Sequence, residues 1–432
     1  MPHPCGIGIL CVNLVYFRLQ IHLTPFPGRH RGFTPTNAPT MDISAIQKAL
    51  KARKFDGWLL CDFRNRDFLA YRALGLDIGK MSSRRWYYYI PARGEPRKLV
   101  SAVEKHYLDA LPGKTQVYLS WEELHSMLRK MPGAARKTIA MQYSPKNHVP
   151  YIALVDAGTV ELLKGFGHRV VSSADLLQMF VSVIDEEGYR LHKEAGVIVD
   201  RIRAEAFGKI RDAVGSGNGA TEYDIQQFIM NRFRQEGLTT YSPPMVGTND
   251  HPADPHFDTM KETARQFHAG DTVLIDMWAK KDVPKGIYYD ITWVGFIGDT
   301  PPPKYLSIYH AVRDARDAAI DFVTTSFARG KPCFGWQVDD ACRNVVKKAG
   351  YGKYFVHRTG HSITEDTHGN GVNIDNLETK DERQILPGCC FSIEPGIYLP
   401  GAMAVRTEIN MFIRHDGTPE VTGEVQRDLV LL

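Results

Sequence analysis

Two glutamates interrupt an apolar stretch near the end of the chain, and this stretch limits the possible folds more than any other. Residues 391–410 read FSIEPGIYLPGAMAVRTEIN, which predicts two short strands around Pro-Gly turns, each carrying one acid, Glu394 or Glu408. Arg406 shares a strand face with Glu408, because side chains two positions apart point the same way. A buried carboxylate is costly without a positive partner, and one arginine cannot serve both acids. Either both acids lie at the surface, or other parts of the chain complete a site around them.

Two other stretches contain similar anomalies. Residues 270–298 predict a hairpin with strands at 272–278 and 287–297, each apolar apart from one acid, Asp276 or Asp290. Residues 357–371, HRTGHSITEDTHGNG, place His357, His361 and His368 in a loop with three glycines. A single histidine is usually structural, but three so close together suggest a site.

Five of these residues form a candidate metal-binding set: Asp276, Asp290, His361, Glu394 and Glu408. Four carboxylates in one place repel one another strongly unless cations neutralise them, and two divalent ions balance their formal charge. Oxygen ligands with one imidazole suit manganese and also allow zinc, cobalt or iron. Two metal ions can share a water molecule and hold it as a nucleophile near neutral pH, which predicts hydrolytic chemistry.

The order D…D…GH…EPG…RxE resembles the metallopeptidases with the pita-bread fold, namely aminopeptidase P, prolidase (Xaa-Pro dipeptidase) and methionine aminopeptidase, a fold shared with creatinase. The resemblance covers about residues 184–432 and fills all five ligand positions. It implies an α+β fold with a pita-bread catalytic domain over 184–432. Alternating short strands and helices in residues 41–183 predict a smaller α/β domain of the creatinase type before it. Residues 1–40 look like a leader or an upstream extension, since Met41 begins a natural helix start.

The resemblance also implies a role for each ligand. Asp276 would chelate one metal ion, and Asp290 and Glu408 would bridge both ions. His361 and Glu394 would complete the second metal site. Glu394 would also carry the proton from the metal-bridging water to the leaving amine.

Further residues have implied roles outside the ligand set. His368 would hydrogen-bond the substrate carbonyl and the oxyanion formed from it. His256 in DPHF resembles a histidine that contacts the substrate, with His251 as its competitor, and His357 resembles the pocket histidine of HxxGH. Arg406 would orient Glu408 through a charge-assisted hydrogen bond.

These features together predict a dinuclear metallopeptidase that cleaves the bond before proline in dipeptides or short peptides. The alternative is a pita-bread hydrolase or lyase for a small zwitterionic metabolite, and a metal-free binding or scaffold protein is a third possibility. Three departures concern the substrate side: the two aspartates are three positions further apart than usual, Trp293 stands where an arginine is common, and the loop before Glu394 is long. Arg383 in that loop could bind a substrate carboxylate, or it could be a solvated loop residue.

Composition limits the other possibilities. A net charge of +4 without a basic, aromatic-rich block argues against nucleic acid as a partner, and no run of 18 apolar residues suggests a membrane span. The seven cysteines lack a CxxC pair or a disulfide-like spacing, which favours a reducing compartment and hence the cytoplasm. A homodimer is an expectation from the resemblance alone. Helices are expected at 184–214, 221–236, 306–328 and 338–349.

Overall fold

A six-stranded mixed sheet organises the first part of the chain. The computed structural model describes residues 41–432, so the leader predicted for residues 1–40 lies outside the described residues. The sheet order is β4-β3-β2-β1-β5-β6. Its strands are β1 (Gly57–Asp62), β2 (Trp86–Pro91), β3 (Arg97–Ser101), β4 (Lys114–Tyr118), β5 (Thr138–Met141) and β6 (Arg169–Ser172). The helices are α1 (Ile43–Ala52), α2 (Phe68–Leu74), α3 (Trp121–Lys130), α4 (Ala157–Gly165) and α5 (Ala174–Leu177).

Helices pack on both faces of this sheet. Side chains alternate along its strands, so each strand contributes residues to both cores. In β1, Trp58 and Leu60 pack with α1 and α2, whereas Leu59 packs with α3 and α4 on the other face. The alternation of short strands and helices predicted for residues 41–183 is present. Strands β3 and β6 each contain only two strongly apolar residues, so their sequences give a weak strand signal. In β3, Lys98 is buried and donates to the carbonyl oxygens of Leu108 and Leu111.

The rest of the chain contains two helix pairs, each followed by strands. The first group is α6 (Glu186–Ser216), α7 (Glu222–Gln235), β7 (Leu238–Thr239), β8 (Met245–Thr248), β9 (Thr272–Lys281) and β10 (Tyr289–Phe296). The second is α8 (Pro303–Ala328), α9 (Gly335–Lys348), β11 (Ser362–Ile363), β12 (Cys390–Ile393), β13 (Gly396–Leu399), β14 (Met403–Arg406), β15 (Ile409–Ile413), β16 (Pro419–Val421) and β17 (Val430–Leu431). The four helices predicted here are confirmed, with ends shifted by a few residues.

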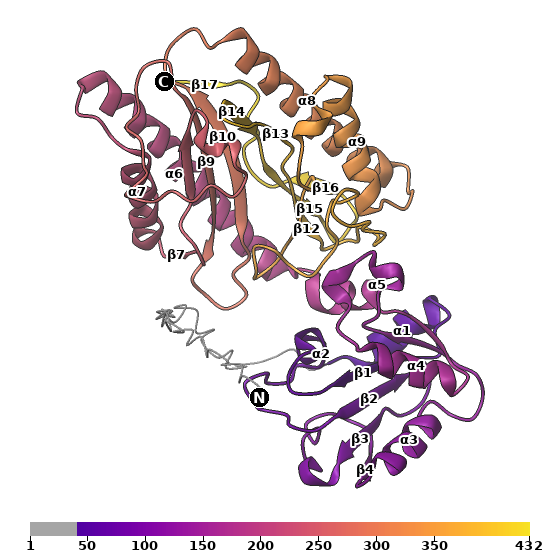
Figure 1. Ribbon diagram of the computed structural model, residues 1–432. Helices are drawn as coiled ribbons and strands as arrows, with labels where there is room; N and C mark the ends of the chain where they lie inside the picture. The colour runs from indigo at the N-terminus through magenta and orange to yellow at the C-terminus, as the bar shows by residue number, and fades with distance from the viewer. Residues whose placement is uncertain (1–40) are drawn as a thin grey trace, which may run out of the picture.

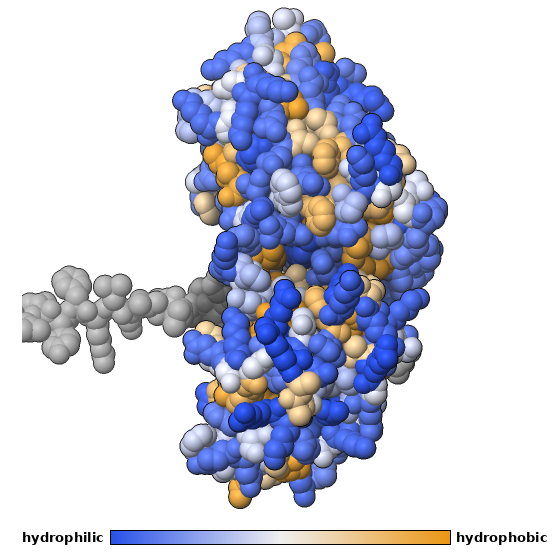
Figure 2. Space-filling model, turned by 90° about the vertical axis from the view of Figure 1, so that its right-hand side faces the viewer, coloured by the Kyte–Doolittle hydropathy of each residue, from blue (hydrophilic) through white to orange (hydrophobic). Residues whose placement is uncertain are grey.

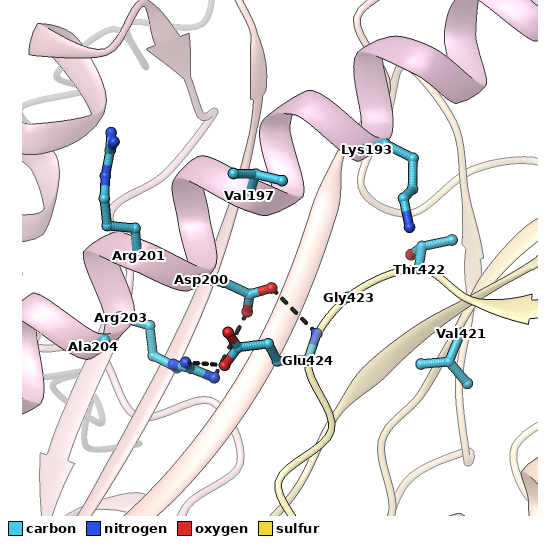
Figure 3. Close-up of a pocket in the computed structure, with 10 residues that line it drawn as sticks. All are labelled: Lys193, Val197, Asp200, Arg201, Arg203, Ala204, Val421, Thr422, Gly423 and Glu424. Atoms are coloured by element: carbon cyan, nitrogen blue, oxygen red, sulfur yellow. Dashed lines mark hydrogen bonds and ion pairs between the residues drawn. The ribbon is translucent and has the colours of Figure 1, made fainter.

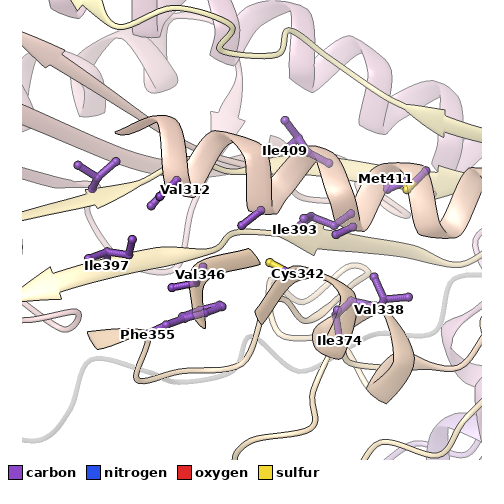
Figure 4. Packing of buried hydrophobic residues seen from close by; sticks show 14 of the residues in the cluster. Val312, Val338, Cys342, Val346, Phe355, Ile374, Ile393, Ile397, Ile409 and Met411 are labelled. Atoms are coloured by element: carbon purple, nitrogen blue, oxygen red, sulfur yellow. The ribbon is translucent and has the colours of Figure 1, made fainter. Parts of the chain in front are cut away.

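The helices lie outside and the strands lie between them. In Figure 1, α6 and α7 flank β9 and β10 on one side, while α8 and α9 lie on the other side beside the strands of the second group. The second core is formed by α8, α9 and these strands, with Val312, Val338 and Ile409 among its members (Figure 4). The side-chain amide of Asn410 on β15 joins the two groups, because it exchanges hydrogen bonds of 3.1 and 2.6 Å with the backbone of Asp290 on β10.

The stretch with two glutamates differs from the prediction of two strands. It forms one long hairpin in which β12 pairs with β15 and β13 pairs with β14, and both acids lie at the break between these pairs. Ile393 pairs with Ile409 and Gly396 with Arg406, so the same register places Glu394 opposite Glu408. At the break, the backbone N–H groups of the two glutamates do not pair within the hairpin. The N–H of Glu394 donates to the carbonyl oxygen of Thr359 at 2.7 Å, and the N–H of Glu408 donates to that of Thr292 at 3.0 Å. The break therefore anchors both acids to neighbouring segments.

The surface is mixed in character. Apolar residues form separate patches within a largely hydrophilic surface on the face shown in Figure 2. Within residues 41–432, no helix combines the length and the apolar character required to cross a membrane.

Candidate metal centre

The predicted ligands come from both strand groups and meet between them. Ligand atoms of Asp290, His361 and Glu408 all lie within 4.8 Å of one another. Glu394 joins this cluster, with its Oε1 atom 3.4 Å from Nε2 of His361. Asp276 lies opposite Thr292 on the paired strand, and the Thr292 hydroxyl donates to Glu408 at 2.8 Å. The structure thus brings the five residues into one cluster.

The hairpin of β9 and β10 presents the two aspartates on the same face. Asp276 pairs with Thr292 and Asp290 pairs with Trp278, in a register without interruption from Tyr289 to Phe296. Because residues two apart on a strand share a face, both carboxylates point toward the second strand group. The long turn, residues 282–288, leaves this register intact.

The position of His361 depends on close backbone packing beside β12. A Cβ atom on Gly360 would lie 1.9 Å from the carbonyl oxygen of Ser392, so only glycine fits there. The backbone of His361 then bonds to Ser392 on both sides: its N–H donates to the Ser392 hydroxyl at 3.0 Å, and its carbonyl accepts from the Ser392 N–H at 2.9 Å. Nδ1 of His361 lies 3.2 Å from the carbonyl oxygen of Ser362, which places the ring proton on Nδ1. Nε2 is left as a lone-pair donor facing the carboxylates.

The electrostatics of the cluster fit divalent cations. Burial and the neighbouring acids raise the pKa values of Asp290 and Glu408 far above the usual carboxyl range. Burial also raises the pKa of Glu394 to about 7 and lowers the pKa of His361 far below its ordinary value, so this imidazole is neutral. Oδ1 of Asp290 is buried and has no hydrogen-bond partner among the described residues. Buried acids with an unpaired oxygen beside a neutral imidazole are suitable ligands for divalent metal ions.

Arg406 acts differently from the prediction. It forms an ion pair with Asp276, not with Glu408. Its Nε donates to Oγ1 of Thr292 at 3.0 Å, and this hydroxyl donates to Oε2 of Glu408 at 2.8 Å. The predicted direct hydrogen bond from Arg406 to Glu408 is therefore wrong. The strand break turns Glu408 toward β10, so Thr292 connects the two side chains.

His357 belongs to the same hydrogen-bond network. Its Nδ1 donates to the carbonyl oxygen of Arg358 at 2.6 Å, so its Nε2 accepts from the hydroxyl of Tyr398 at 2.7 Å. That hydroxyl also accepts from Nη1 of Arg406 at 2.9 Å. Burial, with Arg406 adding to it, lowers the pKa of His357 to about 3, so the ring is neutral. Both ring nitrogens are occupied, which favours a positioning role over direct contact with a substrate.

His368 is placed beside the cluster. Its ring centroid lies 4.3 Å from that of His361, and the two rings are nearly perpendicular. The side chain remains partly exposed, yet the surrounding protein, with Arg358 and His256 contributing, lowers its pKa to about 4. A neutral, accessible imidazole at this position can donate a hydrogen bond to a substrate.

The structure separates the two competing upstream histidines. His251 is bound to the buried carboxylate of Glu222 through Nδ1, at 2.8 and 2.9 Å, and its ring stacks on Phe257. His251 therefore has a structural role, since its ring is held by Glu222 and Phe257. His256 is exposed, and its backbone N–H donates to Asp254 at 3.0 Å, while its ring has no hydrogen-bond partner among the described residues. This arrangement favours His256 as the substrate-contacting residue, a role that stays a prediction.

Two departures in the sequence have structural explanations. Trp293 faces away from the cluster and stacks on the guanidinium of Arg203, 3.5 Å from its ring centroid. Arg383 is buried and paired with Asp381, and it donates to the carbonyl oxygen of Asn370 at 2.8 Å. The suggestion that Arg383 binds a substrate carboxylate is therefore wrong, because a buried acid two residues away already occupies it.

A separate depression of about 510 Å³ lies between α6 and residues 421–424, on the opposite face of β10 from the metal ligands (Figure 3). The charged side chains Arg203 and Asp200 that line it already have protein partners. Arg203 donates to Glu424 at 2.7 Å, and Asp200 accepts from the Tyr289 hydroxyl at 2.9 Å. We assign this depression a structural role only.

Two residues of the site's hydrogen-bond network were not identified from the sequence: Thr292 and Tyr398. Thr292 had a recognisable signal, since it shares a strand face with Asp290 two positions earlier. Tyr398 had none, because its contacts with His357 and Arg406 depend on how separate segments of the chain fold together.

Comparison with known proteins agrees with this geometry. The model of metallopeptidase family M24 matches residues 190–415, more than half of the chain. The probable dipeptidase PepE of Mycobacterium tuberculosis is 29% identical over 262 residues, which cover 61% of this chain and 64% of that protein. The Xaa-Pro dipeptidase of Lactobacillus helveticus is 29% identical over 238 residues, covering 55% of this chain and 59% of that protein. Both matches span less than two thirds of the relative's length.

The fold is also similar to a solved structure. Dipeptidase PepE from Mycobacterium ulcerans superposes with a TM-score of 0.62 at 23% identity, covering 90% of this chain and 96% of that one. The predicted fold class, an α/β N-terminal domain before a pita-bread domain, is confirmed. The domain limits at residues 40 and 183 stay predictions.

Proposed function

The chain belongs to metallopeptidase family M24, and from this premise we propose that it hydrolyses the bond between an N-terminal residue and proline in dipeptides or short peptides. The observation that carries the proposal is the meeting of four carboxylates, of which Asp290 and Glu408 are buried and Asp276 and Glu394 largely buried, with one neutral imidazole between two strand groups. The similarity to dipeptidases and to an Xaa-Pro dipeptidase supports the substrate class.

The ligand set fits two divalent metal ions, for which we propose manganese. Asp276, Asp290, His361, Glu394 and Glu408 would hold them. When bound, such ions lower the pKa of a water molecule and polarise a carbonyl group. Thr292 and Arg406 hold Glu408 and Asp276 in position through their hydrogen bonds.

Protein groups would carry the remaining chemistry. Glu394 would accept a proton from the attacking water and return it to the leaving proline nitrogen. Ser392 supports this orientation, since its hydroxyl donates to Oε1 of Glu394 at 3.2 Å. His368 would donate a hydrogen bond to the substrate carbonyl oxygen, where negative charge develops during the attack. His256 would contact the substrate near the same position.

A panel of peptides tests the proposal. Manganese-loaded protein is given Ala-Pro, Ala-Pro-Ala, Ala-Ala and Ala-Ala-Ala, and the release of alanine is measured. We expect cleavage of the proline peptides only. If the manganese-loaded protein cleaves none of them, the Xaa-Pro assignment is wrong, and the alternative of a hydrolase or lyase for a small zwitterion takes its place. A homodimer and a cytoplasmic location stay predictions.

A further inference from the structure

The position of His368 depends on the loop that carries it. Its side chain is exposed, and its ring forms no hydrogen bond with any residue of the described range 41–432. The ring contacts that of His361, at a centroid distance of 4.3 Å. A ring contact of this kind does not fix the direction of an N–H group. The point at which this imidazole can donate a hydrogen bond is therefore set by the backbone of its loop, residues 364–368.

Backbone hydrogen bonds fix the two ends of this loop. At one end, the carbonyl oxygen of Thr364 accepts from the N–H of Tyr288 at 3.0 Å. At the other end, the N–H of Gly369 donates to the carbonyl oxygen of Ser362 at 2.6 Å. The residues between these ends form neither a helix nor a strand. A contact in the middle of the loop therefore decides how firmly His368 is held.

Lys280 on β9 supplies a contact in the middle of the loop. Its Nζ atom donates to the carbonyl oxygen of Glu365 at 2.6 Å, and this oxygen has no other donor among residues 41–432. A hydrogen bond from an ammonium group is charge-assisted and stronger than one between neutral groups. The ring of Tyr288 lies 5.0 Å from the same ammonium group, which adds a cation–π contact. Lys280 thus holds the loop three residues before His368.

The N-terminal domain also contacts this loop. Arg72 on α2 pairs with Asp366 at 2.7 Å, and both side chains are about half exposed. Solvent and salt screen an ion pair of this kind, so it contributes little. The hydrogen bond from Lys280 is less exposed and ends on the backbone itself. Of the two contacts, the one from Lys280 therefore restrains the loop more.

The strand position of Lys280 links the loop to the metal cluster. Lys280 lies four positions after Asp276 on β9, and side chains at even spacing share a strand face. Its backbone is fixed within the sheet, where it pairs with Thr239 of β7. One strand thus carries both a proposed metal ligand and the anchor of the loop that presents His368.

Charge pairing does not explain a lysine at this position. Lys280 is half-buried and burial lowers its pKa, yet it forms no ion pair within residues 41–432. An ammonium group loses hydration on burial, and an ion pair would offset that cost. Lys285, at the turn of the same hairpin, is exposed and pairs with Asp185 at 2.6 Å. The hydrogen bond to Glu365 is therefore what the structure gains from Lys280.

We propose that Lys280 is a positioning residue for His368: its ammonium group holds the carbonyl oxygen of Glu365 and so fixes the loop where the imidazole can donate to the substrate carbonyl. This rests on the proposed function and deepens it, because it adds a residue that acts on the reaction only through His368. Lys280 acts without contacting the substrate. Its loss should therefore lower turnover and leave substrate binding almost unchanged.

A double-mutant cycle on manganese-loaded protein tests this role. On Ala-Pro, Lys280→Met should lower kcat about 10-fold and change KM less than about twofold, because the donor to the developing oxyanion is displaced. Lys280→Arg should stay within about threefold of wild type, since a guanidinium group can donate to the same carbonyl oxygen. In protein that already carries His368→Ala, adding Lys280→Met should change kcat less than about twofold, because the two residues act as a unit. An equal loss in both backgrounds would overturn the proposal.

Two control variants separate this role from a general loosening of the fold. Lys285→Met removes a lysine from the same hairpin, but one that pairs with Asp185 and not with the loop, so kcat should change less than about twofold. Arg72→Gln removes the exposed contact with the loop and should also cost less than about twofold. A loss of kcat in either control that equals the loss in Lys280→Met would contradict a specific role of Lys280.

Hydrogen–deuterium exchange of the purified protein tests the role without any substrate. The amides of residues 365–368 should exchange about 10-fold faster in Lys280→Met than in wild type, while those of β10 stay unchanged. Lys280→Arg should restore slow exchange. Unchanged exchange in Lys280→Met would overturn the proposal even if the protein cleaves Ala-Pro. Faster exchange confined to this loop would support it even if Ala-Pro is not cleaved, in which case the proposed function alone fails.

Discussion

Thr292 lies where the two acid-bearing hairpins meet. Its hydroxyl accepts a hydrogen bond from Arg406 and donates one to Glu408, and it is fully buried on the face that carries Asp290. A residue of this kind would set the orientation of Glu408, a proposed metal ligand, without contacting the metal. Such outer hydrogen bonds commonly change metal affinity by about 10- to 100-fold.

We therefore predict that Thr292→Val weakens manganese binding about 10- to 100-fold, because valine keeps the shape of threonine but not its hydroxyl. The affinity is measured by competition with a chelator. Thr292→Ser is the matched control, since it retains the hydroxyl and should bind manganese within about threefold of wild type. Equal affinities for the valine and serine variants would remove Thr292 from the network.

His368 provides a second prediction at this scale. His368→Ala should lower kcat on Ala-Pro by about 100-fold, because a donor to the developing oxyanion is lost, while the metal content stays unchanged. His268→Ala serves as the control, since that side chain is 68% exposed and pairs only with Asp271. Unchanged turnover in the His368 variant would exclude it from the mechanism.

The residue scale also shows what the sequence could predict. The five candidate ligands were visible because acids within apolar strands, and histidines close to glycines, are unusual in isolation. The partner of Arg406 was not visible, because it depends on how the hairpin of β9 and β10 docks against the other hairpin. The suggestion that Arg383 binds a substrate carboxylate was wrong for a related reason. Arg383 pairs with Asp381 in a buried position, and the loop sequence does not reveal that burial.

At the scale of elements, the break in the hairpin built from β12 to β15 is what positions Glu394 and Glu408. Pro395 has no N–H group, and the N–H groups of Glu394 and Glu408 bond to Thr359 and Thr292 outside the hairpin. The sequence predicted strands here but placed the acids inside them. In a regular antiparallel ladder, the backbone of each glutamate would bond to the strand that carries the other. Because the ladder is broken here, each glutamate bonds instead to a different segment outside the hairpin.

Helix α6 is held to the end of the turn before β10 by a buried histidine. His192 is 1% exposed, with Nδ1 at 2.6 Å from the carbonyl oxygen of Tyr288 and Nε2 at 2.7 Å from the hydroxyl of Thr422. Burial lowers its pKa to about 4. In the unfolded chain an exposed histidine titrates near pH ~6.5, so between pH ~4 and ~6.5 the unfolded state binds the proton and the folded state does not.

The free energy of unfolding should therefore fall as the pH drops through this window. The contribution of His192 is up to about 3 kcal/mol, and the loss is complete below pH ~4. Urea unfolding at pH 7 and pH 5 measures it, comparing wild type with His192→Gln. The titration of the metal ligands is common to both proteins and cancels in the comparison. We expect a smaller loss of stability in the variant, and equal losses would contradict the assignment.

At the scale of the whole molecule, the two domains are joined by a buried glutamine. Gln178 accepts from the N–H of Val372 and donates to the carbonyl oxygen of Gln384, both at 2.6 Å. Through these two hydrogen bonds, Gln178 connects the N-terminal part of the chain to the segment between His361 and Glu394. This connection could not be predicted from sequence, because Gln178 is 194 and 206 positions away from its two partners and no local pattern marks the pairing.

We predict that Gln178→Ala lowers the free energy of unfolding by about 3 kcal/mol, because two buried backbone groups lose their partners. Gln47→Ala is a suitable control. Gln47 also makes two hydrogen bonds, to Pro91 and Gly94, but near the surface, where water can replace them. Chemical unfolding of both variants should show a difference of at least about 1 kcal/mol. Equal stabilities would mean that Gln178 does not hold the junction.

The metal content of the purified protein tests the central claim most directly. Wild type, Asp290→Ala and Asp212→Ala are loaded with manganese, dialysed and measured by inductively coupled plasma mass spectrometry. Asp212 is a control because its side chain is 74% exposed. We predict two manganese ions per chain in wild type and in the Asp212 variant, and at most one in the Asp290 variant. Two ions retained after Asp290→Ala would contradict the proposed dinuclear centre.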